Sequence, residues 1–253
     1  MPIALTILIV IFLIIALTYY LTVWSKAQLF GYFPDSIKTD RKVIALSFDD
    51  GPNPPYTNTL LEILKRHNVK ATFFMPGQNI ENFPDLVREI YNDGHVIGSH
   101  SYSHKFSNNY QSLTFEKEIK RGGEIVAKTI GRQPALYRPP WLFNQPFLLK
   151  NLKAHGLTPV SGFFSSNWEI WHASAERIAK DALRTVKPGR ILIFHDGFDT
   201  KGGARTGSVG AIDIIIPELK KQGYEFLTVA ELLGVKAYQE NKEEIIGANL
   251  IRF

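Results

Sequence analysis

The chain of 253 residues contains no cysteine. A disulfide framework, a cysteine-ligated zinc site and a thiol nucleophile are therefore excluded, and any bound metal must be held by histidine and carboxylate side chains. Low-complexity tracts and internal repeats, which mark disordered and repeat proteins, are also missing. With 45% hydrophobic residues, the length fits one sizeable globular domain and a small additional segment.

Long runs of basic residues are absent as well. The formal net charge is +5, yet no stretch of five or more lysines and arginines occurs, so we expect no nucleic-acid partner. The modest positive charge fits either an ordinary basic surface or attraction to an anionic partner such as cell wall or lipid head groups.

The first 25 residues lack charged side chains altogether. As a helix, the apolar residues 3–24 would measure about 33 Å at ~1.5 Å per residue, enough to cross the hydrocarbon core of a bilayer. Tyr19, Tyr20 and Trp24 cluster at one end, where aromatic residues meet the membrane interface. This composition favours a transmembrane helix.

Two other interpretations of this segment are a buried helix and a cleaved signal peptide. The tripeptide Ser25-Lys26-Ala27 loosely resembles a cleavage site, but the apolar run is long for a signal peptide and no basic residues precede it. We therefore expect an uncleaved anchor. The predicted organisation is an anchor at 1–25, a linker at 26–41, the main domain at 42–235 and a tail at 236–253.

Beyond the anchor, strand-like and helix-like patterns alternate. Short apolar runs predict strands at 42–48, 71–75, 95–99, 135–137, 158–164, 190–194 and 225–229. Amphipathic segments predict helices at 57–67, 84–92, 115–130, 147–154, 174–186 and 212–222, with a short one near Glu231. This order favours an α/β fold with a mostly parallel sheet, open or closed into a barrel. Ligands of such folds bind at the C-terminal ends of the strands.

Reactive residue types follow several of these predicted strands directly. They are Asp49 and Asp50 after the first strand, His100 and His104 after the third, Arg138 after a later one, and His195 after 190–194.

The segment His100-Ser101-Tyr102-Ser103-His104 places two imidazoles four residues apart, which suits a divalent metal, although two surface histidines have the same spacing. Asp49-Asp50 offers a third ligand, although the following Gly51-Pro52 is also typical of a plain turn. Two adjacent acids suggest that one binds metal while the other acts as a base. An Asp and two His leave coordination positions open for water and a substrate oxygen.

His195 and Arg138 each have a structural alternative. A single histidine at the end of an apolar strand is usually structural, and an arginine is often part of a surface salt bridge. In the company of the other residues, we interpret His195 as part of the site. Arg138 could hold a carboxylate through its two-pronged donors.

Four segments resemble, in the same order, the motifs of the polysaccharide deacetylases of carbohydrate esterase family 4, also called the NodB-homology domain. They are Ser47-Phe48-Asp49-Asp50-Gly51-Pro52, Gly98-Ser99-His100-Ser101-Tyr102-Ser103-His104, Arg138-Pro139-Pro140-Trp141 and Ile193-Phe194-His195. These are similar to the family's T/S-F-D-D-G-P, H-S/T-x-x-H, R-x-P-Y and L-x-H motifs. The resemblance covers residues 42–233 and implies a distorted (β/α)7 barrel.

The resemblance also implies a role for each matched residue. Asp50, His100 and His104 would bind one divalent metal ion, usually zinc. Asp49 would be the general base, His195 the general acid, and Arg138 would orient Asp49. Residues implied along the oxyanion and substrate groove are Trp141, through its backbone N–H, Trp168 and Ile193.

The implied reaction is metal-dependent hydrolysis of N-acetyl groups in an N-acetylglucosamine-containing polysaccharide of the cell wall or cell exterior, with release of acetate. One alternative is a deacetylase or deformylase of a lipid-linked sugar, with which the anchor is compatible. Another is a membrane-tethered glycan-binding protein with little or no activity. The joint presence of a base, an acid and metal ligands argues against the last, because binding alone needs neither base nor acid.

The orientation in the membrane has two conflicting indicators. Basic residues lie only after the anchor, at Lys26, Lys38, Arg41 and Lys42, and the positive-inside tendency alone would place the domain in the cytoplasm. An external glycan substrate requires the opposite. Because one lysine close to the helix is a weak signal, we expect an extracytoplasmic catalytic domain.

One motif departs from the family pattern. Where the family usually has D-x-x-D-W, this chain has Phe164-Ser165-Ser166-Asn167-Trp168, and the second acid normally supports the catalytic histidine. Asn167 brings no negative charge, so the sequence predicts a lowered pKa for His195 and weaker proton donation near neutrality. Asp196 or another acid could instead supply the charge.

Overall fold

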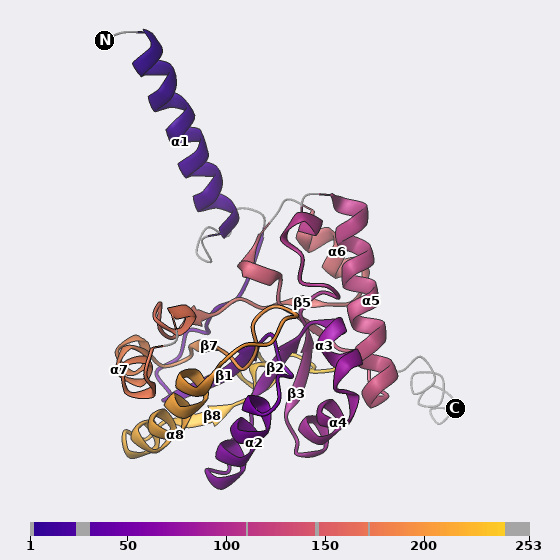
Figure 1. The fold of residues 1–253 in the computed structure, drawn as a ribbon, viewed down its shortest axis with the longest axis vertical. Helices are drawn as coiled ribbons and strands as arrows, with labels where there is room; N and C mark the ends of the chain where they lie inside the picture. The colour runs from indigo at the N-terminus through magenta and orange to yellow at the C-terminus, as the bar shows by residue number, and fades with distance from the viewer. Residues whose placement is uncertain (1–2, 24–30, 110, 145–146, 172, 241–253) are drawn as a thin grey trace.

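The computed structural model describes residues 3–23, 31–109, 111–144, 147–171 and 173–240 (Figure 1). Helix α1 (Ile3–Val23) stands apart from the rest of the chain in Figure 1, and its apolar side chains are exposed. With a mean hydropathy of 2.7 over residues 3–21, it is long and apolar enough to cross a membrane or to serve as a signal sequence. Trp24 and the segment 25–27 lie outside the described residues.

Eight strands form one sheet in which every pairing is parallel, in the order β5-β4-β3-β2-β1-β7-β6, with β8 also paired to β1. This is the parallel α/β architecture predicted from the sequence, curled into a distorted barrel that stays open between β5 and β6. The strands are β1 (Val43–Asp49), β2 (Thr72–Met75), β3 (Val96–Ser99), β4 (Leu136–Tyr137), β5 (Thr158–Pro159), β6 (Phe163–Phe164), β7 (Ile191–His195) and β8 (Glu225–Leu227).

Helices surround this sheet (Figure 1). The α-helices are α2 (Tyr56–Arg66), α3 (Gly77–Asn82), α4 (Pro84–Asn92), α5 (Ser112–Ile130), α6 (Leu148–Ala154), α7 (Ala175–Thr185), α8 (Thr206–Lys221) and α9 (Val229–Leu233), with 3-10 turns η1 (Phe106–Asn109), η2 (Pro140–Leu142) and η3 (Glu169–Trp171).

The central strand β1 is buried along its whole length. Its side chains point alternately to the two faces of the sheet, and the two faces have different surroundings. Successive side chains of a strand point to opposite faces. Ile44, Leu46 and Phe48 join the large core with α2, α4, α7 and α8. Val43 and Ala45 join a smaller cluster on the other face. Ser47 and Asp49 share this second face, which therefore changes from apolar to polar toward the C-terminal end of the strand.

Two helices differ from the sequence prediction for identifiable reasons. Helix α3 was not predicted, because Gly77 and Asn79 are poor helix formers; the amide of Asn79 instead donates to the carbonyls of Asp50 and Asp199. Helix α8 begins six residues earlier than predicted. Gly207 within it lowers helix propensity, but a Cβ there would lie 2.0 Å from the carbonyl oxygen of Ala173, so close packing requires glycine.

The predicted extended segment 158–164 is divided into β5 and β6, which flank the opening of the barrel. The chain just before β1 runs beside this opening: the backbone N–H of Ser161 donates to the carbonyl of Pro34, and the backbone N–H of Ile191 donates to the carbonyl of Asp35. Phe33 is only 1% exposed and packs in a small buried cluster. The packed domain therefore begins before residue 42, within the segment predicted as a linker.

Candidate active site

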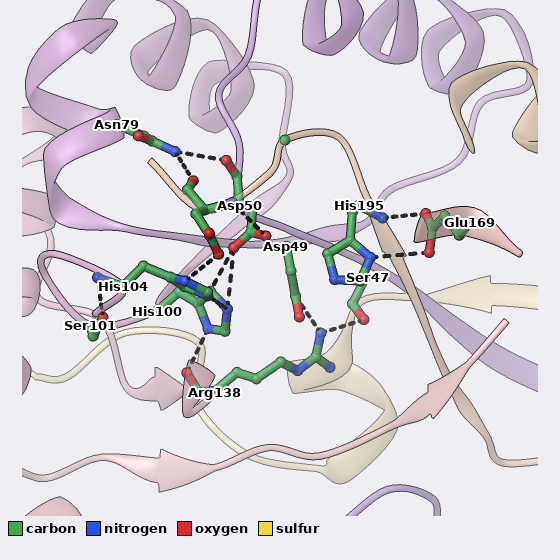
Figure 2. A network of polar contacts seen from close by, with 12 residues as sticks. Ser47, Asp49, Asp50, Asn79, His100, Ser101, His104, Arg138, Glu169 and His195 are labelled. Carbon is green, nitrogen blue, oxygen red and sulfur yellow. Dashed lines mark hydrogen bonds and ion pairs between the residues drawn. The ribbon is translucent and has the colours of Figure 1, made fainter. Parts of the chain in front are cut away.

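The strand register collects the predicted site residues at one edge of the sheet (Figure 2). Asp49, the last residue of β1, pairs with His195, the last residue of β7. On the other side, Ser99 of β3 pairs with Tyr137 of β4, so that the next residues, His100 and Arg138, leave the sheet together. These residues are far apart in the sequence, and they become neighbours because the strands that carry them pair in parallel.

Asp50, His100 and His104 form a compact group of possible metal ligands. The Nε2 atoms of the two histidines lie 3.2 Å apart, and Asp50 Oδ1 lies 3.2 Å from His104 Nε2 and 3.6 Å from His100 Nε2. Ligand atoms about 2.0–2.2 Å from a tetrahedral zinc ion are about 3.3–3.6 Å from one another. The three atoms therefore match the edges of such a site without rearrangement.

The partners of the two Nδ1 atoms determine that the Nε2 atoms of His100 and His104 face Asp50. His100 Nδ1 lies 2.7 Å from the carbonyl of Arg138, so this nitrogen carries the proton and Nε2 presents a lone pair. His104 Nδ1 lies 2.8 Å from the Asp199 carboxylate, which has the same effect. Asp50 Oδ1 is buried and has no hydrogen-bond donor. Three electron pairs converging in a buried space suit a cation, and carboxylate or carbonyl partners behind the histidines are typical of metal sites.

The pKa values of the two histidines follow from the same surroundings. Burial, with the neighbouring His104, lowers the pKa of His100 well below its usual value, which keeps the ring neutral as a ligand must be. For His104, burial acts in the same direction, but the carboxylates of Asp50 and Asp199 outweigh it and raise the pKa.

Helix α5 holds the loop that carries both histidines. Glu118 Oε2 accepts the backbone N–H groups of Tyr102 and Ser103, at 3.2 and 2.7 Å, and the Ser103 hydroxyl at 2.9 Å. One turn later, Gly122 permits close approach, since a Cβ there would lie 2.6 Å from the carbonyl oxygen of Ser101. Ser101 itself has φ 67°, a conformation that costs an L residue about 1–2 kcal/mol. These contacts stabilise a loop shape that the backbone alone disfavours.

Asp49 points toward the same space and is paired with a fully buried arginine (Figure 2). Arg138 Nη1 donates to Asp49 Oδ1 at 2.6 Å and to the Ser47 hydroxyl at 2.9 Å, and its Nη2 donates to the carbonyl of Ser161 at 3.0 Å. Burial raises the pKa of Asp49 and Arg138 partly offsets this. The carboxylate is thus oriented rigidly and is more basic than an exposed aspartate.

His195 has a carboxylate partner that the sequence did not reveal. Glu169 accepts the backbone N–H of His195 at 2.7 Å through Oε1 and lies 3.0 Å from His195 Nδ1 through Oε2 (Figure 2). Burial, the largest single effect, lowers the pKa of His195, but the charge and hydrogen bond of Glu169, together with the charges of Asp50 and Asp49, outweigh it and raise the pKa to about 9. The prediction of a lowered pKa was therefore wrong. Asn167, on which it rested, is exposed, and the charge comes from two residues further on.

One pocket of about 130 Å³ opens over these groups. It is lined by Asp49, Asp50, His100, His104 and His195, together with Trp141, Leu142, Phe164, Phe198, Asp199 and Arg205. The ring of Trp141 lies against His104, with 4.4 Å between ring centroids.

Two residues expected along the oxyanion and substrate groove do not line this pocket. Ile193 is fully buried in a cluster with Phe33 and Leu142, and Trp168 lines a neighbouring hollow instead of this pocket.

Among the residues that sequence reasoning missed, Glu118, Glu169 and Asp199 support the predicted site residues directly. Each acts through another residue, and none lies within a recognised motif. For Glu169 a signal existed, because it directly follows the tryptophan of a motif from which the expected acid is missing. For Glu118 and Asp199 no pattern in the chain points to the residue that each one contacts.

Comparison with known proteins identifies one family. Residues 36–160 match the family model described as Polysaccharide deacetylase. Over 207 residues the chain is 35% identical to a peptidoglycan-N-acetylglucosamine deacetylase of Bacillus cereus, with 81% of this chain and 95% of that protein covered.

Solved structures give the same result. The crystal structure of a peptidoglycan N-acetylglucosamine deacetylase in complex with 4-naphthalen-1-yl-N-oxidanyl-benzamide matches with a TM-score of 0.75 and 34% identity, covering 81% of this chain and 94% of that one. A family 4 acetyl xylan esterase from Clostridium thermocellum, in complex with a cobalt ion, matches with a TM-score of 0.69 and 35% identity, covering 78% and 94%.

Proposed function

The chain belongs to the polysaccharide deacetylase family, and from this premise we propose that it removes N-acetyl groups from N-acetylglucosamine residues of a cell-wall polysaccharide. The reaction is hydrolysis of a carbon–nitrogen bond other than a peptide bond, and it releases acetate and a free sugar amine.

One observation carries this proposal: an acid–histidine–histidine ligand set, a buried carboxylate and a carboxylate-paired histidine line the same pocket. A binding protein has no use for a base and an acid placed at one pocket. An enzyme that must activate water and protonate an amine needs both.

Asp50, His100 and His104 are the residues that would hold the metal, which we take to be zinc. When bound, a divalent ion of this kind supplies Lewis acidity to a carbonyl oxygen and a water. The geometric match of the ligand atoms and the orphaned Asp50 Oδ1 support this assignment.

The remaining steps are proton transfers and charge stabilisation by the chain itself. Asp49, oriented by Arg138, accepts a proton from the attacking water. His195, kept protonated by Glu169, donates a proton to the departing sugar nitrogen. The backbone N–H of Trp141, at the rim of the pocket, is a donor for the oxyanion of the tetrahedral intermediate.

We further infer that residues 3–24 anchor the chain in a membrane with the catalytic domain outside the cytoplasm. The apolar helix supports the anchor, and a polysaccharide substrate supports the direction.

The test is acetate release by the full-length chain in detergent, on N-acetylglucosamine polymers, after treatment with a chelator and after addition of zinc or cobalt. We expect the chelator to abolish release and the metal to restore it. An absence of acetate with every metal would refute the proposal, and full activity in the chelator would refute its metal dependence.

A further inference from the structure

A second cavity, of about 220 Å³, lies at the start of helix α8 beside the catalytic pocket. Two of its lining residues connect it to the catalytic groups. Glu169 lines this cavity and pairs with His195, and Arg205 lines both this cavity and the catalytic pocket. The other lining residues are small or apolar, or belong to the first turn of α8. Arg205 is therefore the residue that the two cavities have in common.

Arg205 is held in place but keeps free hydrogen-bond donors. The residue is only 4% exposed. Its Nε donates to the carbonyl of Gly197 at 2.6 Å, and its guanidinium carbon lies 5.3 Å from the centroid of the Phe198 ring. Neither Nη atom donates to any residue in the described part of the chain. The N–H groups of a guanidinium form a fork that matches the two oxygens of a carboxylate, and in Arg205 part of this fork is unused.

The positive charge of Arg205 has no acidic partner. The acids that line the two cavities each pair with a different residue: Asp49 with Arg138, Asp50 and Asp199 with His104, and Glu169 with His195. Glu169 and the protonated His195 form a pair without net charge, so Glu169 does not cancel the charge of Arg205. Among the described residues, Arg205 forms no ion pair. A buried charge without a counter-ion is costly, so this guanidinium favours a bound anion.

The first turn of α8 adds to the positive potential. This helix has 16 residues, and no side chain caps its N-terminal end at Arg205. The first N–H groups of a helix have no acceptor within the helix, and its N-terminus carries about half a positive charge. Ser208, in the same turn, is 3% exposed and lines the cavity with its neighbours. A free guanidinium and a helix N-terminus at one cavity together suit a small anion.

We propose that Arg205 and the first turn of α8 form a carboxylate-binding site, separate from the metal ligands, that takes up the acetate released in the catalytic pocket. The choice of acetate rests on the deacetylase function proposed above, which forms one carboxylate per reaction in a pocket that Arg205 lines. The two oxygens of acetate match the guanidinium, and Ala173 and Ile178 give the cavity an apolar wall for its methyl group. While the glycan still covers the pocket, this site holds the acetate away from the reacting groups.

The test measures binding of isotope-labelled acetate to the full-length chain in detergent, by NMR relaxation of the acetate, after a chelator has removed the metal. Removal of the metal removes the other group that would bind acetate. We expect saturable binding of acetate and none of acetamide, which has nearly the same shape but no charge. Arg205→Gln should weaken acetate binding about tenfold or more, because a charge-assisted contact is lost. Arg205→Lys, which keeps the charge without the fork, should give an intermediate affinity.

Two controls accompany these variants. Arg184→Gln removes an arginine of α7 whose side chain is 68% exposed, and it should bind acetate as wild type does. A metal content of about one per chain after reloading shows that each Arg205 variant is folded. If Arg205→Gln does not fold, Arg205→Lys and the comparison of acetate with acetamide in wild type still decide the matter.

A kinetic readout connects the site to the product. In the metal-loaded chain, added acetate should inhibit the formation of free sugar amine from N-acetylglucosamine polymers, and Arg205→Gln should need about tenfold more acetate for the same inhibition. Equal acetate affinity in wild type and both Arg205 variants, or acetamide binding as tight as acetate binding, overturns the site. Inhibition that does not depend on Arg205 overturns its role in taking up the product. Binding is measured without turnover, so a chain that binds acetate but forms no sugar amine overturns the deacetylase function instead.

Discussion

Replacement of Glu169 by glutamine should separate the two tasks that this side chain performs. Glutamine has nearly the same shape, so its carbonyl can still accept the backbone N–H of His195, as Glu169 Oε1 does. The negative charge 3.0 Å from His195 Nδ1 is lost. Because Glu169 is only 2% exposed, water cannot replace that charge. The variant therefore tests the electrostatic role without emptying the space.

The size of the effect follows from the structure. At 3.0 Å, two unit charges attract by about 5.5 kcal/mol with an effective dielectric constant of ~20. Burial of the imidazolium offsets much of this attraction, Asp50 and Asp49 add to it, and the pKa of His195 becomes about 9 instead of 6.5. A difference of about 2.5 units corresponds to about 3 kcal/mol at 1.36 kcal/mol per unit, which is of the order expected for a buried pair.

As the general acid, His195 must be protonated to act, so its pKa sets the alkaline limb of the pH profile. In Glu169→Gln the pKa of His195 falls, because burial still lowers it and the opposing Glu169 charge is gone, so this limb should move to lower pH. The loss of activity should therefore be much larger at pH 8, on the order of tenfold or more, than at pH 6, where more of the imidazole stays protonated. By the same linkage, the pair stabilises the fold fully below about pH 6.5 and loses this contribution as the pH rises through about 9.

The measurement is kcat/KM against pH for wild type, Glu169→Gln and Asn167→Asp, all loaded with the same metal. Asn167 is exposed, so a new carboxylate there should leave the limb where it is, contrary to what the sequence motif alone predicts. Coincident limbs for wild type and Glu169→Gln would refute the reasoning. So would a loss of activity in Glu169→Gln that is equal at pH 6 and pH 8, because it would indicate a structural role only.

Four further predictions concern the ligands, the base, the loop and the anchor. His100→Ala should lose the metal that elemental analysis finds at about one per wild-type chain; unchanged content would contradict the ligand assignment. Asp49→Asn should keep the metal and lose activity by ~10²–10⁴-fold. Near-full acetate release by this variant would show that Asp49 is not the general base. Glu118→Ala should weaken metal binding about 10–100-fold in chelator competition, whereas Glu124→Ala, an exposed position on the same helix, should not; equal affinities would exclude the loop-holding role. Protease added to intact cells or protoplasts should digest the catalytic domain, and complete protection until lysis would reverse the orientation.

The sequence by itself determined the family, the fold class and the main site residues. Four short motifs stand in order at the ends of predicted strands. Because the strands of a parallel sheet all end at the same edge, the residues that directly follow them come together at that edge. The parallel sheet and the deacetylase family were both confirmed. The convergence of Asp50, His100 and His104 also follows from this local logic, since each lies within a few residues of a strand end.

Other features depend on packing between segments that are distant in the sequence, and such contacts cannot be inferred from a local pattern of residues. Helix α8 begins early because Gly207 fits against Ala173, although glycine argues against a helix in isolation. Phe33 reads as part of a linker, yet the opening between β5 and β6 gives it a buried place.

The partner of His195 is the clearest case. The motif directs attention to Asn167, but the turn at η3 exposes that side chain and buries Glu169 against β7 instead. The motif shows that an acid is missing at position 167. Only the path of the backbone determines which carboxylate lies beside the imidazole of His195. A shift of two positions reverses the sign of the predicted pKa change, because an ion pair depends on distance in space and not on position in the chain.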